Sequence, residues 1–173
     1  MIFNIVIESA DCAGKDISFC RKAIRAIIYW DDRLLLVRTK KGDYKFPGGG
    51  VMQEEGHTET LVREVREETG YQIERVNDLL GIVIERRPDK YDSSKIFEMK
   101  SYYYLCDIGS KQEEQDLDDY EHELEFKPVW VEPGNAYMQN AGIIAEKADD
   151  LNPWVDRETL VLQQLILKSG GKL

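Results

Sequence analysis

The feature that most constrains this chain is the stretch from residue 46 to residue 71, which reads FPGGGVMQEEGHTETLVREVREETGY. It opens on a proline and three glycines, and glycine lets the backbone bend sharply and approach another group closely. An acidic segment with apolar residues at helical spacing follows. We expect a helix that begins near Gly56 or Thr58 and ends at Gly70, a residue suited to a C-terminal cap.

Three glutamates of this predicted helix share one face. Residues three and four positions apart lie on the same side of a helix, so Glu64, Glu67 and Glu68 project together. Leu61 and Val65 form a neighbouring apolar face, which can pack on a core while the carboxylates point toward a cleft. Such a cluster is repulsive unless a cation neutralises it. Oxygen ligands without a cluster of His and Cys residues favour Mg²⁺ or Mn²⁺ over zinc.

The alternative is a solvated helix face. In that case Glu59, Arg63 and Glu67 form surface ion pairs at a spacing of four residues, and the carboxylates hold no ligand. For an acidic helix without further context, this alternative is the more common one. The glycine turn favours a site instead, because a surface helix does not need backbone carbonyls and amides beside its acidic face.

The segment from Gly49 to Tyr71 resembles the Nudix box, G-x5-E-x7-R-E-U-x-E-E-x-G-U, in which U is a bulky apolar residue. Every position matches except the last, where Tyr71 replaces the usual aliphatic residue. The resemblance implies the Nudix fold, a mixed β-sheet between helices in which the box forms a loop-helix-loop. It also implies hydrolysis of a pyrophosphate bond in a nucleoside diphosphate linked to another moiety, X, by water that Mg²⁺ or Mn²⁺ activates.

The resemblance assigns roles to residues of the box. Glu67, Glu68 and the carbonyl of Gly48 correspond to metal ligands, and Glu64 corresponds to a ligand or to the base for the attacking water. Arg63 is expected to orient a neighbouring glutamate through charge-assisted hydrogen bonds. Two further residues of the pattern have supporting roles: Gly49 and Glu55.

In the resembled family, an acidic residue from later in the chain often completes the metal site. It comes shortly before a strand with a Trp-Val pair like Trp130-Val131, so the candidates here are Glu121 and Glu123. Both have many acidic neighbours, and the choice between them stays open. His57, at the expected helix start, fits a capping or surface position better than a catalytic one.

The rest of the chain predicts an α/β protein of the α+β kind rather than a regular alternation of strands and helices. Asp31-Asp32-Arg33 is expected to form a hairpin turn between two apolar strands. The expected strands are residues 2–7, 25–30, 34–38, 44–46, 79–85, 96–108 and 127–131. The expected helices after the box run from Pro133 to about Lys147 and from after Pro153 to Gly170.

We expect one domain over residues 1–173, because this length suffices for a single core and no repeat or linker interrupts it. Residues 1–19 are expected to form an N-terminal extension and residues 153–169 an additional C-terminal helix, and the resemblance supports neither. The sequence contains no apolar run of about 18 residues and no signal peptide. We therefore expect a cytoplasmic protein without membrane contact.

The net charge of the chain limits the classes of partner that it can bind. The formal net charge of -10, without a basic patch, opposes binding of polymeric nucleic acid. A small phosphorylated nucleotide that arrives with Mg²⁺ is compatible, because the metal screens both partners. The three cysteines lack metal-ligand spacing and predict reduced thiols. The oligomeric state stays open, with a homodimer as one alternative.

The segment Arg86 to Lys95, RRPDKYDSSK, is expected to be a positively charged loop. It either closes over a phosphorylated substrate or is a long hairpin loop that its charges keep soluble. The candidate phosphate contacts are Arg86, Arg87, Lys90 and Lys95. The candidates for stacking on a base are Tyr44 and Tyr91, each of which could equally be a core or rim residue.

Three functions are compatible with the sequence. The favoured one is a Nudix-type pyrophosphohydrolase that acts on a nucleoside triphosphate, ADP-ribose, a nucleotide sugar or a related metabolite. The alternative is a nucleotide- or metabolite-sensing module that keeps the fold without turnover. A third, an interaction protein whose acidic helix is only surface, leaves the glycine turn unexplained.

Overall fold

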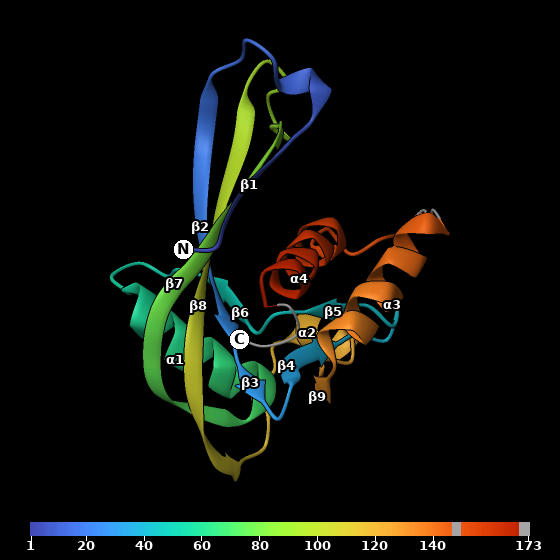
Figure 1. Cartoon of the computed structure of the whole chain (residues 1–173). Coiled ribbons are helices and arrows are strands. Elements are labelled where there is room, and N and C mark those ends of the chain that lie inside the picture. The colour runs from blue at the N-terminus through green and yellow to red at the C-terminus, as the bar shows by residue number, and fades with distance from the viewer. Residues whose placement is uncertain (147–149, 170–173) are drawn as a thin grey trace.

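The computed structural model describes residues 1–146 and 150–169, and it is an α+β structure with two sheets and four α-helices in that part of the chain (Figure 1). The first sheet has five strands, given in spatial order: β1 (Phe3–Glu8), β7 (Tyr71–Pro88), β8 (Ile96–Gln112), β2 (Ile17–Ile27) and β6 (Gly48–Gly50). The second sheet consists of β3 (Tyr29–Trp30), β4 (Arg33–Arg38), β5 (Tyr44–Lys45) and β9 (Lys127–Val131). Parallel and antiparallel pairs both occur in the first sheet, so the predicted mixed sheet is confirmed.

Helices cover the strands from two sides. The helices are α1 (His57–Thr69), α2 (Asp119–Glu123), α3 (Pro133–Ala145) and α4 (Val155–Ser169), and a short 3-10 helix η1 spans Ala10–Cys12. In Figure 1, α1 lies beside β7 and β8, whereas α3 and α4 lie with the second sheet. None of the described helices is both long and apolar enough to cross a membrane. The predicted ends of the last two helices, near Lys147 and Gly170, lie outside the described residues.

The core explains why the strands need helices on both sides. In β4, Leu34 and Leu36 pack in a cluster with Leu162 of α4, whereas Leu35 packs in a second cluster with Leu61 and Val65 of α1. A strand buried on both faces has a continuous apolar run instead of an alternating one. The run Leu34 to Val37 has this pattern, and all four residues are fully buried.

The predicted hairpin is confirmed. Asp31 and Asp32 have φ angles of 48° and 59°, and Trp30 pairs directly with Arg33. Two left-handed residues between paired strands match the right-handed twist of a hairpin, and aspartate tolerates that conformation well. The turn is therefore the two-residue step Asp31-Asp32.

Two strands begin much earlier than the sequence predicts. β2 starts at Ile17 instead of residue 25, and β7 starts at Tyr71 instead of residue 79. These extra segments expose many of their side chains, so they lack the apolar runs on which the prediction depended. Their backbones are paired all the same, because β8 pairs with β2 on one side and β7 on the other. In Figure 1 the ends of β2, β7 and β8 near η1 project beyond the helices.

The predicted loop from residue 86 to residue 95 is wrong at its start. β7 continues to Pro88, which pairs with Ile96, so only residues 89–95 connect the strands. Arg86 lies in the strand and forms ion pairs with Glu8 at 2.9 Å and Glu98 at 2.8 Å. Carboxylates on both adjacent strands thus explain why a charged residue continues β7.

A buried aspartate joins three segments near the end of the chain. Asp43 lies in the turn before β5 and is 1% exposed. Its carboxylate accepts hydrogen bonds from Asn152 Nδ2 at 2.8 Å and Trp154 Nε1 at 2.7 Å, and from the hydroxyl of Thr39. The segment that leads into α4 is therefore hydrogen-bonded to the segment that leads into β5.

Helix α4 is further held by a buried ion network. Arg157 is 1% exposed, and its guanidinium pairs with Glu85 of β7 at 2.7 Å and with Glu158 at 2.6 Å. The hydroxyl of Tyr103 donates a hydrogen bond to the other oxygen of Glu158 at 3.3 Å. A helix outside the resembled segment is thus tied to β7 and β8 by groups that are costly to leave unpaired.

We predict that Arg157→Met lowers the free energy of unfolding by about 3–5 kcal/mol, because Glu158 is then left as an uncompensated buried charge. Urea unfolding followed by tryptophan fluorescence measures the change. The matched control is Arg66→Met, which removes an exposed pair with Asp116 at 3.5 Å and should cost less than about 1 kcal/mol. Equal losses for the two variants would contradict the role of the buried network.

Candidate active site

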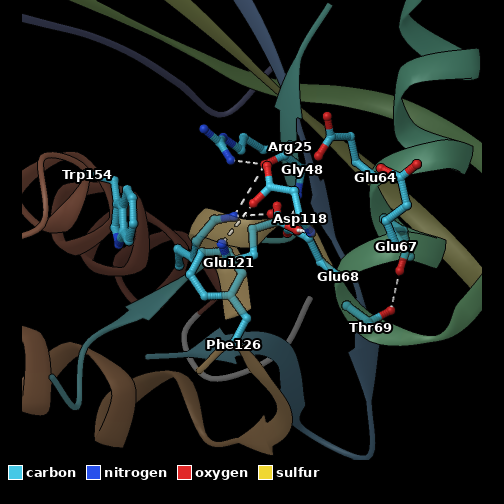
Figure 2. Close-up of polar contacts among 12 residues, drawn as sticks. Arg25, Gly48, Glu64, Glu67, Glu68, Thr69, Asp118, Glu121, Phe126 and Trp154 are labelled. Atoms are coloured by element: carbon cyan, nitrogen blue, oxygen red, sulfur yellow. Dashed lines mark hydrogen bonds and ion pairs between the residues drawn. The ribbon is translucent and has the colours of Figure 1, made fainter. Parts of the chain in front are cut away.

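A cleft of about 730 Å³ lies between the glycine strand β6, helix α1 and the end of the chain that carries α4. Glu64, Glu68 and Glu121 line it, and one carboxylate oxygen of each lies within 4.8 Å of the others. We call these three residues the acid cluster. Figure 2 shows it beside Gly48 and Arg25, with Phe126 and Trp154 on the side away from Glu64.

The glycines bring the backbone against these carboxylates. β6 pairs antiparallel with β2, and Gly48 lies opposite Arg25. Gly48 has a φ of 136°, and a Cβ there would lie 2.1 Å from the carbonyl oxygen of Ile24. A Cβ on Gly49 would lie 2.3 Å from Glu64 Oε1, and the Gly48 amide donates to Glu68 Oε2 at 2.9 Å. Gly48 is therefore required by its positive φ and its close packing on β2, whereas a Cβ on Gly49 would displace the Glu64 carboxylate.

Arg63 organises the acidic face of α1. Its guanidinium donates to both oxygens of Glu55, at 2.6 Å and 2.9 Å, which is a bidentate pair. Its Nη1 also donates to Glu64 at 2.8 Å and to Glu67 at 3.1 Å. The hydrogen bonds from Arg63 to Glu55 lower the pKa of Glu55 to about 2. Arg63 therefore holds three carboxylates in fixed positions.

The box glutamates do not all reach the cleft. Glu64 and Glu68 are buried in it, whereas Glu67 is about one-third exposed, does not line it and pairs with Arg63. An α-helix turns by about 100° per residue, so adjacent residues 67 and 68 point in different directions. The structure thus separates one of the two glutamates that the resemblance assigns as main metal ligands.

The structure distinguishes the two later candidates, because Glu121 lines the cleft and Glu123 is exposed. Glu121 lies in α2, where Asp118 Oδ1 accepts its amide hydrogen at 2.8 Å and its own Oε2 accepts from the Asp118 amide at 3.1 Å. This reciprocal pair is a capping box, whose pattern of an N-cap residue followed three positions later by glutamate is visible in the sequence. That signal could have selected Glu121.

The acid cluster has an excess of negative charge that affects its own ionisation. Burial raises the pKa of Glu64, and the charge of Glu68 raises it further. Burial followed by the charge of Glu68 raises the pKa of Glu121 to about 7. Three carboxylate oxygens this close are the ligands that a hard divalent cation prefers, and its charge would offset the repulsion that raises these pKa values. The residues present therefore fit a Mg²⁺ or Mn²⁺ ion.

Three cations that the sequence analysis did not select also line the cleft. Arg25 is 8% exposed and donates from Nη1 to the Gly48 carbonyl, while its buried Nε has no hydrogen-bond partner in the described part of the chain. Arg21 lies four residues earlier on the same strand face, with the small Ala23 between them. Lys45 is 4% exposed and forms an ion pair with Glu68. The alternation of Arg21, Ala23 and Arg25 at every second position is the sequence signal that could have identified this face of the strand.

The other predicted substrate contacts lie in different surroundings. Arg86 and Arg87 line the cleft from β7, and Arg87 lies over the ring of Phe97 at 4.9 Å. Tyr44 packs against the main core, and its backbone is hydrogen-bonded to the Asn140 side chain. Three residues from the 89–95 connection are not among the cleft-lining residues described: Lys90, the 92% exposed Tyr91 and Lys95.

The side chain of His57 lies against two tyrosines of β8. Its Nδ1 lies 2.8 Å from the hydroxyl of Tyr104, and its ring contacts Tyr102. Burial, followed by the charge of Lys22, lowers the pKa of His57. It is not among the described residues that line the cleft.

The comparisons with known proteins agree with this geometry. A family model described as the NUDIX domain matches residues 21–155. An ADP-ribose pyrophosphatase of Methanocaldococcus jannaschii is 42% identical over 64 residues, which cover 35% of this chain and 37% of that relative. The chain thus matches little more than a third of the relative's length.

Two solved structures show the same fold. A NUDIX hydrolase from Nitrosomonas europaea is 21% identical, with a TM-score of 0.53 over 88% of this chain and 90% of that one. A MutT NUDIX hydrolase from Burkholderia pseudomallei is 22% identical, with a TM-score of 0.50 over 84% and 98%. The family match over most of the sequence, with the box and the fold in agreement, shows that this chain belongs to the Nudix family.

Proposed function

We propose that this protein is a Mg²⁺- or Mn²⁺-dependent pyrophosphohydrolase that acts on a nucleoside diphosphate linked to a second moiety, X. One observation carries the proposal: three carboxylates lie within 4.8 Å of one another in a cleft that also contains a buried arginine with a free donor. Negative and positive groups in one cleft suit a substrate that carries phosphates together with a metal ion.

The acid cluster is the proposed metal site. Glu64, Glu68 and Glu121 would hold the cation, which supplies charge neutralisation for the diphosphate and activation of water when bound. Arg63 fixes Glu64 through Oε1, and Oε2 of Glu64 has no hydrogen-bond partner in the described residues. We assign to Glu64 the acceptance of the proton from the attacking water, because Glu64 lines the cleft and its Oε2 is not engaged by a hydrogen bond among the described residues.

Arg25 and Arg21 are the proposed contacts for a substrate phosphate. The other arginines and the lysine that line the described cleft have partners: Arg86 pairs with Glu8 and Glu98, Arg157 with Glu85 and Glu158, Lys45 with Glu68, and Arg87 contacts Phe97. Arg25 keeps Nε free of a hydrogen bond, and Arg21 has no ion pair among described residues. A guanidinium without a carboxylate partner is the group that a phosphate binds in a planar, two-point fashion.

ADP-ribose is the first candidate for the whole substrate, because the curated relative is named an ADP-ribose pyrophosphatase. X would lie against walls of the cleft that are formed in part by residues outside the segment that matches the family model. Ile7 and Glu8 of β1 and Arg157 of α4 line the cleft, and all three lie outside residues 21–155.

We predict Mg²⁺- or Mn²⁺-dependent cleavage of at least one compound from a panel of ADP-ribose, nucleotide sugars, nucleoside triphosphates and dinucleoside polyphosphates. Product phosphates separated by ion-exchange chromatography measure the reaction, and EDTA should abolish it. Glu68→Gln should lower turnover by about a hundredfold or more and is the control for contaminating hydrolases. Inactivity toward the whole panel with metal present would favour a sensing module.

Glu121 and Glu123 offer a matched pair of substitutions two residues apart. We predict that Glu121→Gln lowers kcat by about a hundredfold, because it removes one charge of the acid cluster, and that Glu123→Gln stays within about twofold of the unchanged protein. Steady-state kinetics on the preferred substrate measure both. The reverse order would place Glu123 in the site.

We predict that Arg25→Lys raises KM by about tenfold, because an ammonium lacks the planar fork that contacts a phosphate at two points. Arg21→Gln should raise KM in the same direction without loss of stability, since Arg21 is exposed. Arg33→Gln, an exposed hairpin residue, is the control. Unchanged KM in both cleft variants would remove these arginines from the substrate site.

A further inference from the structure

Lys45 is a buried lysine in contact with the acid cluster, and the Nudix box does not include it. It lies in β5, which pairs with β4, and only 4% of the residue is exposed. Its ammonium forms an ion pair with Glu68 Oε1 and lies 3.5 Å from the carbonyl oxygen of Gly48. These two oxygen-bearing groups are the ones that the family resemblance assigns to a metal ion.

The surroundings hold the ammonium in this position. The ring of Phe126 lies 4.6 Å from Lys45 Nζ, and the ring of Trp154 lies 5.8 Å from it. Both distances are within the range of a cation–π contact. Trp154 is in turn fixed by its hydrogen bond to Asp43 at 2.7 Å. The aromatic wall and the ion pair together make this a built position for one positive charge.

Glu68 has both carboxylate oxygens engaged. Oε1 pairs with Lys45, and Oε2 accepts the amide hydrogen of Gly48 at 2.9 Å. The Gly48 carbonyl likewise accepts a hydrogen bond from Arg25. A divalent cation that binds Glu68 and Gly48 must therefore compete with a cation of the protein itself.

We infer that Lys45 is a built-in cation of the acid cluster, which keeps the carboxylates assembled without metal and competes with a divalent cation for Glu68 and the Gly48 carbonyl. The inference rests on the proposed function, because it takes the acid cluster as the metal site. Lys45 acts through Glu68 and is a positioning residue. It makes the cluster a weaker site for divalent ions, because a bound dication meets a fixed positive charge beside it.

The test compares Lys45→Met with the unchanged protein in two measurements. Methionine keeps a similar length and removes the charge. Isothermal titration with MnCl₂ should give a Kd lowered by at least about tenfold, because the repulsion between Lys45 and Mn²⁺ is absent. Thermal unfolding in EDTA should show a Tm lowered by about 5 °C or more, because Glu68 is left without its buried partner. Lys45→Gln should shift both quantities in the same directions.

The control is Lys127→Met, which removes the same charge from a side chain that is 70% exposed and paired only with Glu125. It should change neither quantity, because solvent screens that charge. Opposite signs of the two effects, tighter Mn²⁺ binding with lower stability in EDTA, identify competition. A purely structural role of Lys45 would lower both stability and Mn²⁺ affinity, and this outcome overturns the inference.

The two proposals can fail separately. If the unchanged protein and Lys45→Met bind Mn²⁺ with the same Kd, the competition is refuted while the proposed function stands. If neither binds Mn²⁺, both are refuted. If only Lys45→Met binds, the competition is supported in its strongest form, and the metal requirement of the proposed function must then be met together with substrate.

Discussion

Repulsion between closely spaced carboxylates is the constraint on which the rest of this structure depends. Glu64, Glu68 and Glu121 lie within 4.8 Å of one another, and a low local dielectric makes their mutual repulsion severe. The surrounding elements offset this repulsion in three ways. Arg63 pairs with Glu64, Lys45 pairs with Glu68, and backbone amides of Gly48 and Asp118 donate to Glu68 and Glu121. The glycine strand matters because Gly48 packs closely on β2 with its amide directed at Glu68, and Gly49 leaves room for the Glu64 carboxylate.

The sequence predicted the part of the site that has a linear pattern. The glycine turn, the helix with its glycine end and the hairpin at Asp31-Asp32 follow from local spacing and backbone preference. Local spacing placed Glu67 beside Glu68, but only packing decides which side of α1 faces the cleft. Lys45 was missed because a two-residue strand has no periodicity, and its burial arises from Phe126 and Trp154, which are distant in sequence.

Strand β1 and helix α4, which lie largely outside the segment that matches the family model, also help to form the cleft. β1 pairs in parallel with β7, and α4 contributes Val161, Leu162 and Leu165 to the main core. Both also supply cleft-lining residues, whereas the box supplies Glu64 and Glu68 of the acid cluster. Such a division lets a common reaction centre meet different substrates, since binding specificity can change while the carboxylates stay in place.

The hydrogen bonds of Asp43 make that division incomplete. They join the segment before α4 to the turn two residues before Lys45, so the Trp154 wall of the cleft and the strand that carries Lys45 share one buried anchor. A substitution at Asn152 or Trp154 removes a hydrogen bond from the carboxylate that also holds the turn before Lys45, so this wall of the cleft and the strand beside Glu68 are not structurally independent.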